Sequence, residues 1–354
     1  MKVLFNVNHP AKVHLFKNVI KILQENDINV FLTVIDKEVT SELVKNFAEE
    51  NDIKYKIIGK NLGNIFKKAM NVPKIEYELL KISENFKPNL FVGGCDDLYV
   101  SHVAKLVRRP SFIFDTNENA KLLHILTFPF ATKIFTPCCY ETNLGNKQIR
   151  YNGYHELAYL HPNYFTPNSE ILDELNLSKN DNIIILRLVA WNAIHDVGEK
   201  GISQENLKKY IHKLEDFGEV LITSETKLNN DLEKYKLKIK PEKLHDLLYY
   251  STLYIGEGAT TASECAILGT HAIYTNTIKL GYLNELEKKY NLVYNITNPK
   301  NMHIKALNKS LELLENKNLR NEGKKKQKKL LNDKIDVTKY IVNVIENYET
   351  LVEK

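Results

Sequence analysis

Short aliphatic runs alternate with amphipathic segments along most of the chain. In the first half, runs rich in β-branched and aromatic residues predict strands at 2–7, 29–34, 55–58, 90–92, 111–113 and 133–135. The segments between them are helical in pattern; in 13–26, for example, Val13, Phe16, Ile20 and Leu23 share one face. Strands that alternate with helices indicate βαβ units, whose crossovers join parallel neighbours. The first half therefore predicts a parallel sheet with helices on both faces.

The same alternation restarts after an interruption. Residues 151–168 are rich in aromatic and polar side chains and contain Gly153, Pro162 and Pro167, so we interpret them as a crossover between domains. Beyond them, strands are predicted at 183–188, 219–223, 237–239, 253–255, 272–275 and 292–294. The fold class is thus α/β, with two doubly wound Rossmann-like domains at 1–160 and 161–335. The final segment, 336–354, has an apolar stripe at helical spacing that must be buried on another part of the protein.

Composition agrees with this organisation. A chain of 354 residues exceeds what one core usually holds, so two domains are the expectation. The balance of 49 Lys and Arg against 44 Asp and Glu is mild, and we expect no nucleic-acid partner. The 4 cysteines show no C-x-x-C spacing. Neither a secretory signal nor a membrane-spanning run is visible, so we expect a cytoplasmic protein.

The stretch LYIGEGATTASECAILG, residues 253–269, predicts a strand that ends in a glycine turn and opens onto a short helix. Gly256 and Gly258 lack the Cβ atoms that would keep an anion from the backbone. Thr261 and Glu264 match a capping box, and Gly269 is a helix stop. The unpaired amides and the dipole of such a helix suit a diphosphate and need no metal, although an ordinary βα turn is the alternative. The candidate binding residues here are Gly256, Gly258, Ala259, Thr260, Thr261 and Glu264.

Candidate acids and bases follow the strands of the first half. His9 ends the first strand and suits proton transfer near neutral pH, or it caps nearby backbone. Asp96 and Asp97 follow a Gly-Gly pair; helix capping explains one of them, and either would serve as a general base toward a sugar hydroxyl. Asp115 and Glu118 follow the next strand and are expected at the same edge of the sheet. We count His9, Asp96, Asp97 and Glu118 as catalytic candidates, with no spacing that specifies a metal.

Polar residues also punctuate the second half. Arg187 interrupts the aliphatic strand IIILRLV, and its guanidinium requires an anion, either a substrate phosphate or a carboxylate in a structural ion pair. His195, Ser224 and Glu225 lie in loops or at strand ends and are further candidates for substrate binding. His245, in the helical segment PEKLHDLLYY, is expected at the surface. No G-x-G-x-x-G follows the first strand, which disfavours a nicotinamide dehydrogenase.

Together these motifs resemble those of the GT-B glycosyltransferases and nucleotide-sugar 2-epimerases. The words HPAKVHLFK, GGCDD, GYHELAYLHP and GEGATTASECAILGT more closely resemble an archaeal and bacterial family catalogued as a domain of unknown function and grouped with GT-B enzymes. The resemblance implies two domains that face each other across a cleft and a C-terminal helix, 336–354, that crosses back to the first domain.

Individual motifs carry specific implications. By resemblance to the transferase that adds N-acetylglucosamine to a lipid-linked cell-wall precursor, 258–261 would contact a diphosphate and Glu264 the ribose hydroxyls. The segment 94–97 resembles the H-G-D of the 2-epimerases, which supplies an acid near the sugar. The G-T-R-P turn of those epimerases is here 7–10 and has no arginine, which weighs against their elimination chemistry.

The expected function is that of a glycosyltransferase in surface glycan or glycolipid synthesis. It would move a sugar from a nucleotide-diphosphate sugar to a hydroxyl of a glycan or lipid-linked acceptor. We expect the nucleotide to be UDP, and we expect the reaction to need no cofactor and no obligatory metal. A nucleotide-sugar 2-epimerase, hydrolysing or not, is the first alternative, and a noncatalytic sugar-nucleotide-binding protein is the second. Residues 59–74 place Ile65, Phe66 and Met70 among lysines, which predicts an amphipathic surface helix or a peripheral contact with the inner face of the membrane.

Overall fold

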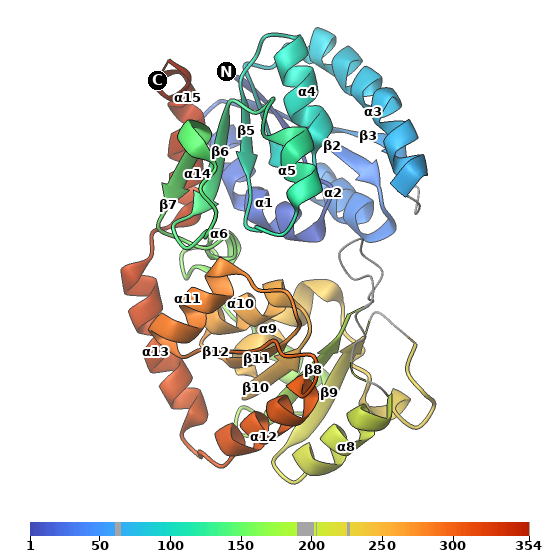
Figure 1. Ribbon diagram of the computed structural model, residues 1–354, viewed down its shortest axis with the longest axis vertical. Helices are drawn as coiled ribbons and strands as arrows, with labels where there is room; N and C mark the ends of the chain where they lie inside the picture. The colour runs from blue at the N-terminus through green and yellow to red at the C-terminus, as the bar shows by residue number, and fades with distance from the viewer. Residues whose placement is uncertain (61–64, 190–201, 203, 225–226, 354) are drawn as a thin grey trace. The chain divides into compact units, whose positions relative to one another are not determined.

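The computed structural model describes residues 1–60, 65–189, 202, 204–224 and 227–353, which form two compact units (Figure 1). Unit 1 comprises Met1–Tyr159 and Ile335–Lys354, and unit 2 comprises Leu160–Lys334. Each unit is an α/β structure around one parallel sheet.

Unit 1 contains a sheet with the strand order β3-β2-β1-β4-β5-β6-β7. Its strands are β1 (Lys2–Asn6), β2 (Asn29–Asp36), β3 (Lys54–Lys60), β4 (Leu90–Gly94), β5 (Ser111–Phe114), β6 (Lys133–Pro137) and β7 (Gln148–Tyr151). Its helices are α1 (Pro10–Glu25), α2 (Glu38–Glu50), α3 (Ile65–Phe86), α4 (Leu98–Leu106), α5 (Lys121–Thr127), α14 (Val337–Glu346) and α15 (Tyr348–Val352), and α6 (Leu157–Leu160) lies at its boundary with unit 2. Val3, Leu4 and Phe5 of β1 are fully buried because helices cover both faces of the sheet.

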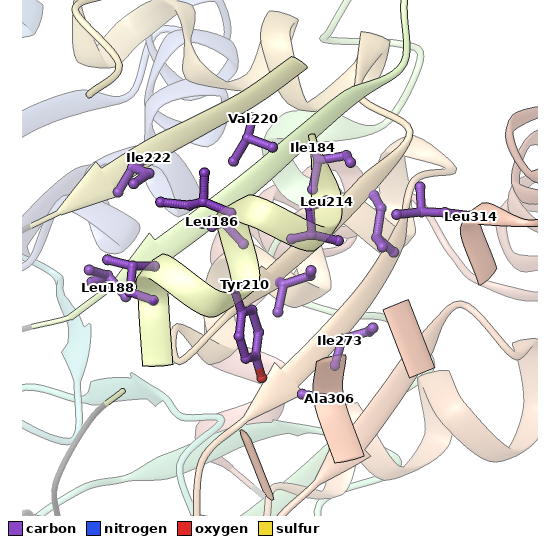
Figure 2. Packing of buried hydrophobic residues seen from close by; sticks show 14 of the residues in the cluster. Ile184, Leu186, Leu188, Tyr210, Leu214, Val220, Ile222, Ile273, Ala306 and Leu314 are labelled. Carbon is purple, nitrogen blue, oxygen red and sulfur yellow. The ribbon is translucent and has the colours of Figure 1, made fainter. Parts of the chain in front are cut away.

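Unit 2 contains a second parallel sheet, with the order β12-β11-β10-β8-β9. Its strands are β8 (Ile183–Leu188), β9 (Glu219–Ser224), β10 (Leu253–Gly256), β11 (His271–Thr275) and β12 (Val293–Ile296). Its helices are α7 (Glu170–Glu174), α8 (Gln204–Leu214), α9 (Leu244–Tyr250), α10 (Ala259–Leu268), α11 (Gly281–Tyr290), α12 (Met302–Leu314) and α13 (Leu319–Asp333). The core unites β8 and α8: Figure 2 shows Ile184, Leu186 and Leu188 of β8 in one buried cluster with Tyr210 and Leu214 of α8.

The structure differs from the predicted strands at two places. Residues 237–239 are not a strand; only an isolated bridge joins Lys236 to Ile222. Conversely, β7 was missed, because its sequence QIRY is mostly polar and we assigned its last residue, Tyr151, to the crossover. β7 lies at the edge of its sheet, where a strand needs fewer apolar residues.

The last helices return to unit 1. α14 packs against α1 and buries Val337, Ile341 and Ile345, which belong to the apolar stripe seen in the sequence. The Thr338 hydroxyl donates to the carbonyl of Ala158 at 2.7 Å. These contacts satisfy the burial that the stripe requires.

α13 supports the end of α10. Gly323 lies so close to Gly269 that an added Cβ would stand 2.2 Å from the Gly269 carbonyl oxygen. Lys324 donates to the Leu268 carbonyl at 2.6 Å, which satisfies one of the carbonyls at the end of α10. Lys324 is therefore a structural contact between α13 and the end of α10.

Among the described residues, no helix has the length and apolarity that a membrane crossing requires. The segment 59–74 is described only in part, since residues 61–64 lie outside the described residues. The helix predicted there corresponds to α3, in which Met70 is 81% exposed.

His271 makes the stability of unit 2 depend on pH. Burial, with smaller contributions from Lys326 and Lys309, lowers the pKa of His271 to about 3. In the unfolded chain the histidine has a pKa near 6.5 and binds a proton that the folded state does not bind. The contribution of His271 to the free energy of unfolding is therefore fully present above about pH 6.5 and falls as the pH drops below it. From pH 7 to pH 4 we expect a loss of about 2–3 kcal/mol from this group. Urea unfolding of His271→Gln should show a weaker pH dependence than wild type, whereas His212→Gln, at an exposed position of α8, should not.

Candidate functional site

The candidate residues gather where the strand order of each sheet reverses. In unit 1 the reversal lies between β1 and β4, and in unit 2 it lies between β8 and β10. Ligands of open α/β sheets bind outside the carboxyl ends of the strands at these reversals. His9 and Asp96 follow β1 and β4, while Arg187 and Gly256 occupy the ends of β8 and β10.

The glycine turn of unit 2 leads directly into α10, as predicted, but the helix begins earlier than the capping box implied. Gly258 is the N-cap and Ala259 and Thr260 form the first helical positions, so Thr261 is already inside the helix. The capping-box prediction is therefore wrong, since Glu264 is buried and its side chain bonds elsewhere. Gly269 ends the helix in the left-handed conformation with φ of 79°, as predicted.

We expected Gly256 to let an anion approach the backbone, but in the structure it makes room for the Arg187 side chain. It pairs with Arg187 across the sheet, and an added Cβ would lie 2.9 Å from the Arg187 Cβ and 2.5 Å from the Tyr254 hydroxyl. A Cβ at Gly258 would lie 3.2 Å from the Arg187 Nε. The two glycines therefore let the guanidinium lie along the turn that precedes α10.

The end of β8 is also linked to its other neighbour. The Arg187 guanidinium is 3.4 Å from the Thr223 hydroxyl of β9, and Ser224 is the last residue of that strand. His195 and Glu225, which we predicted to bind substrate, lie outside the described residues. Ser224 is thus the one of these three whose place at the strand end is described.

His245 is not at the surface, contrary to our prediction. It is buried in α9, and its Nε2 lies 2.9 Å from the Glu264 Oε1. The pair links α9 to α10 and fixes the orientation of the Glu264 carboxylate. A sequence signal was available, because an acid in an otherwise apolar helix requires a partner.

The acid of the glycine turn is a further residue that the sequence did not single out. Glu257 is buried and accepts hydrogen bonds from the backbone amides of Val189 at 3.1 Å and Ile202 at 2.9 Å. It holds the backbone of Val189 and of Ile202 to the glycine turn.

In unit 1, Lys12 unites the paired acids. Its ammonium contacts Asp96 and donates to the Asp97 Oδ2 at 2.8 Å. Asp97 is fully buried; it also accepts from the Gly94 amide at 2.8 Å and from the Asn8 side chain at 2.5 Å. Asp97 occupies the N-cap position of α4, but its side chain makes no capping hydrogen bond, so side-chain capping does not explain this residue.

These contacts shift the pKa values of Asp96 and Asp97 in opposite directions. Burial raises the pKa of Asp97 to about 6, because Lys12 only partly offsets the loss of water. Burial acts in the same sense on Asp96, but Lys12 outweighs it and the pKa of Asp96 is lowered. Burial alone would lower the pKa of Lys12, because it disfavours the charged ammonium. The negative charges of the two carboxylates have the larger combined effect and raise it. The side chain of Asp96 is 35% exposed, so it is the member of the cluster that a substrate can reach.

The remaining catalytic candidates have other contacts. His9 is the exposed N-cap of α1, and its Nδ1 accepts from the Ala11 amide at 3.2 Å, which confirms the capping interpretation. Glu118 accepts from the Glu141 amide at 3.2 Å. Asp115 is buried after β5 and accepts from the Tyr140 hydroxyl at 2.8 Å.

Solved structures of similar fold cover nearly the whole chain. The UDP-GlcNAc 2-epimerase of Neisseria meningitidis, bound to UDP-GlcNAc, has a TM-score of 0.67 at 14% identity and covers 98% of this chain and 99% of its own. The spinosyn forosaminyltransferase SpnP has a TM-score of 0.66 at 11% identity, with 100% of both chains covered. The spinosyn rhamnosyltransferase SpnG, complexed with thymidine diphosphate, has a TM-score of 0.63 at 11% identity over 98% of this chain and 100% of its own. The chain therefore has the GT-B fold of two Rossmann-like domains.

A fold of this kind hosts more than one chemistry, so it does not define the reaction. No curated protein matches the chain in sequence. The model of the family described as "Protein of unknown function (DUF354)" matches residues 1–350, and the chain belongs to that family.

Proposed function

We propose that the protein is a glycosyltransferase that moves a sugar from a UDP-linked sugar to a hydroxyl of a glycan or lipid-linked acceptor. The observation that carries the proposal is the chemistry at the two strand reversals. Unit 2 has a guanidinium beside a helix N-terminus, and unit 1 has a carboxylate held by a buried lysine. Two structural neighbours contain UDP-GlcNAc and thymidine diphosphate, which supports a nucleotide-diphosphate ligand for this chain.

Unit 2 would bind the diphosphate. Arg187 and the unpaired amides at the start of α10 would stabilise the negative charge that develops on the departing diphosphate. Since these groups supply positive charge, the proposal requires no metal. Glu264, oriented by His245, would accept hydrogen bonds from the ribose hydroxyls.

Unit 1 would bind the acceptor. We assign Asp96 rather than His9 as the general base, because Lys12 keeps the Asp96 carboxylate ionised at neutral pH and His9 already caps α1. Lys12 and Asp97 would position it. Glu118 and Asp97 are assigned no proton transfer, since their carboxylates hold the backbone amides of Glu141 and Gly94.

The test is the affinity for UDP of Arg187→Gln. A hydrogen bond to a charged group contributes about 1.5–3 kcal/mol, so the dissociation constant should rise about 10–100-fold by calorimetry. Binding of uridine, which lacks the diphosphate, should not change. Lys209→Gln removes one exposed positive charge from α8 and is the control. Equal UDP affinities for the two variants would contradict the placement of the diphosphate.

A 2-epimerase is the second candidate, favoured by the several carboxylates near the carboxyl ends of β4 and β5. Epimerisation requires acid and base groups around the sugar, and Asp96, Asp97 and Asp115 all belong to this edge. Incubation with a UDP-sugar in deuterated water separates the two: deuterium at the second carbon without any acceptor indicates epimerisation. UDP binding without turnover, unaffected by Asp96 substitution, would indicate a noncatalytic binding protein.

A further inference from the structure

Cys95, Asp115 and His124 bring a thiol, a carboxylate and an imidazole together in unit 1. Cys95 follows β4, Asp115 follows β5 and His124 lies in α5. One ligand atom from each residue lies within 4.8 Å of the other two, and the His124 Nε2 is 2.9 Å from the Asp115 Oδ2. Among the described residues, no other group of three or more such side chains comes this close.

Hydrogen bonds from outside the cluster hold the backbone of Cys95 and the side chain of Asp115. The Thr127 hydroxyl donates to the Cys95 carbonyl at 2.7 Å, which ties the end of α5 to the residue after β4. The Asn117 amide donates to the Asp115 Oδ1 at 3.2 Å, and the Tyr140 hydroxyl donates to Oδ2 at 2.8 Å. Supporting hydrogen bonds of this kind orient the ligands of metal sites.

We propose that Cys95, Asp115 and His124 bind a divalent transition-metal ion of the zinc type. Zn²⁺ takes sulfur, nitrogen and oxygen ligands at about 2.0–2.3 Å in a tetrahedron, and three atoms this close can reach it by side-chain rotation. The His124 Nε2 is buried and makes no hydrogen bond with any described residue, although it lies 2.9 Å from the Asp115 Oδ2, so it is available as a ligand of the cation.

The donor set also selects the ion. A thiol and an imidazole disfavour Mg²⁺ and Ca²⁺, which prefer oxygen ligands, and favour zinc-type ions. Cys95 and Asp115 are 7% and 4% exposed, so the ion would be shielded, with its fourth position left for water. Binding would release the Cys95 thiol proton and join α5 to the ends of β4 and β5. The proposed sugar transfer uses none of the three side chains, so this inference goes beyond it.

Titration of the metal-free, full-length protein with Co²⁺ tests the site. We expect one equivalent to produce a thiolate-to-cobalt absorption band in the near ultraviolet and strong visible bands of tetrahedral cobalt, all removed by Zn²⁺. Cys95→Ser should lose the thiolate band. Cys265→Ser, which removes another buried thiol from unit 2, should keep it.

A second variant retains the thiol. His124→Gln should weaken Co²⁺ binding by at least tenfold, and Zn²⁺ should raise the unfolding temperature of the wild type more than that of either ligand variant. The absence of a thiolate band in the wild type would overturn the proposal, as would its persistence in Cys95→Ser. If Cys95→Ser does not fold, unchanged Co²⁺ affinity in His124→Gln overturns it instead.

Discussion

Replacing Asp96 with asparagine is expected to lower kcat by about 10²–10⁴-fold, the usual contribution of a general base. The two acids after β4 are adjacent in sequence, but only Asp96 combines exposure with a lowered pKa. The asparagine has the same shape and cannot accept the proton of an acceptor hydroxyl. UDP affinity should not change, because the proposed diphosphate ligands all belong to unit 2.

The measurement pairs initial rates with calorimetry, using the UDP-sugar that most raises the unfolding temperature in a panel. Asp52→Asn is the matched control: Asp52 is exposed in the same unit and has a φ of 51°, a conformation that asparagine also adopts readily. If Asp96→Asn and Asp52→Asn turn over substrate at the same rate, Asp96 is not the base.

The pattern of apolar residues was sufficient for the two sheets. Strands such as β1 and β8 are buried on both faces, so they appear in the sequence as continuous aliphatic runs. The two errors in strand prediction concern segments that are not continuous aliphatic runs. Residues 237–239 alternate lysine with aliphatic residues and suit a half-buried strand, while the true edge strand β7 has only one fully buried residue.

Strand ends were predictable, but the contacts made there were not. Parallel strands place their carboxyl ends at one edge, which was sufficient to place Asp97 at the strand reversal of unit 1 and Arg187 at that of unit 2. Lys12 lies 85 residues from Asp97 in sequence, and no local pattern encodes that contact. The pairing of His245 with Glu264 is likewise long-range, and it explains why a good local capping pattern failed.

Removing the charge of Lys12 should destabilise unit 1 strongly. Lys12→Met would leave Asp97, fully buried, next to Asp96 without a cation, and breaking a buried pair in this way costs about 3–5 kcal/mol. Methionine preserves the length and most of the apolar stem, so the loss reports the charge rather than a cavity. Hydrogen exchange of the β1 and β4 amides measures the effect within unit 1.

A second substitution tests the cause. In Lys12→Met/Asp97→Asn the buried negative charge is also absent, so the loss of unfolding free energy should be smaller than in Lys12→Met alone. Lys45→Met, at an exposed position of α2, should alter the exchange of these amides by no more than a surface substitution does. A double variant less stable than Lys12→Met would mean that Asp97 stabilises the turn through its hydrogen bonds to Gly94 and Asn8, and that Lys12 serves mainly to keep Asp96 ionised.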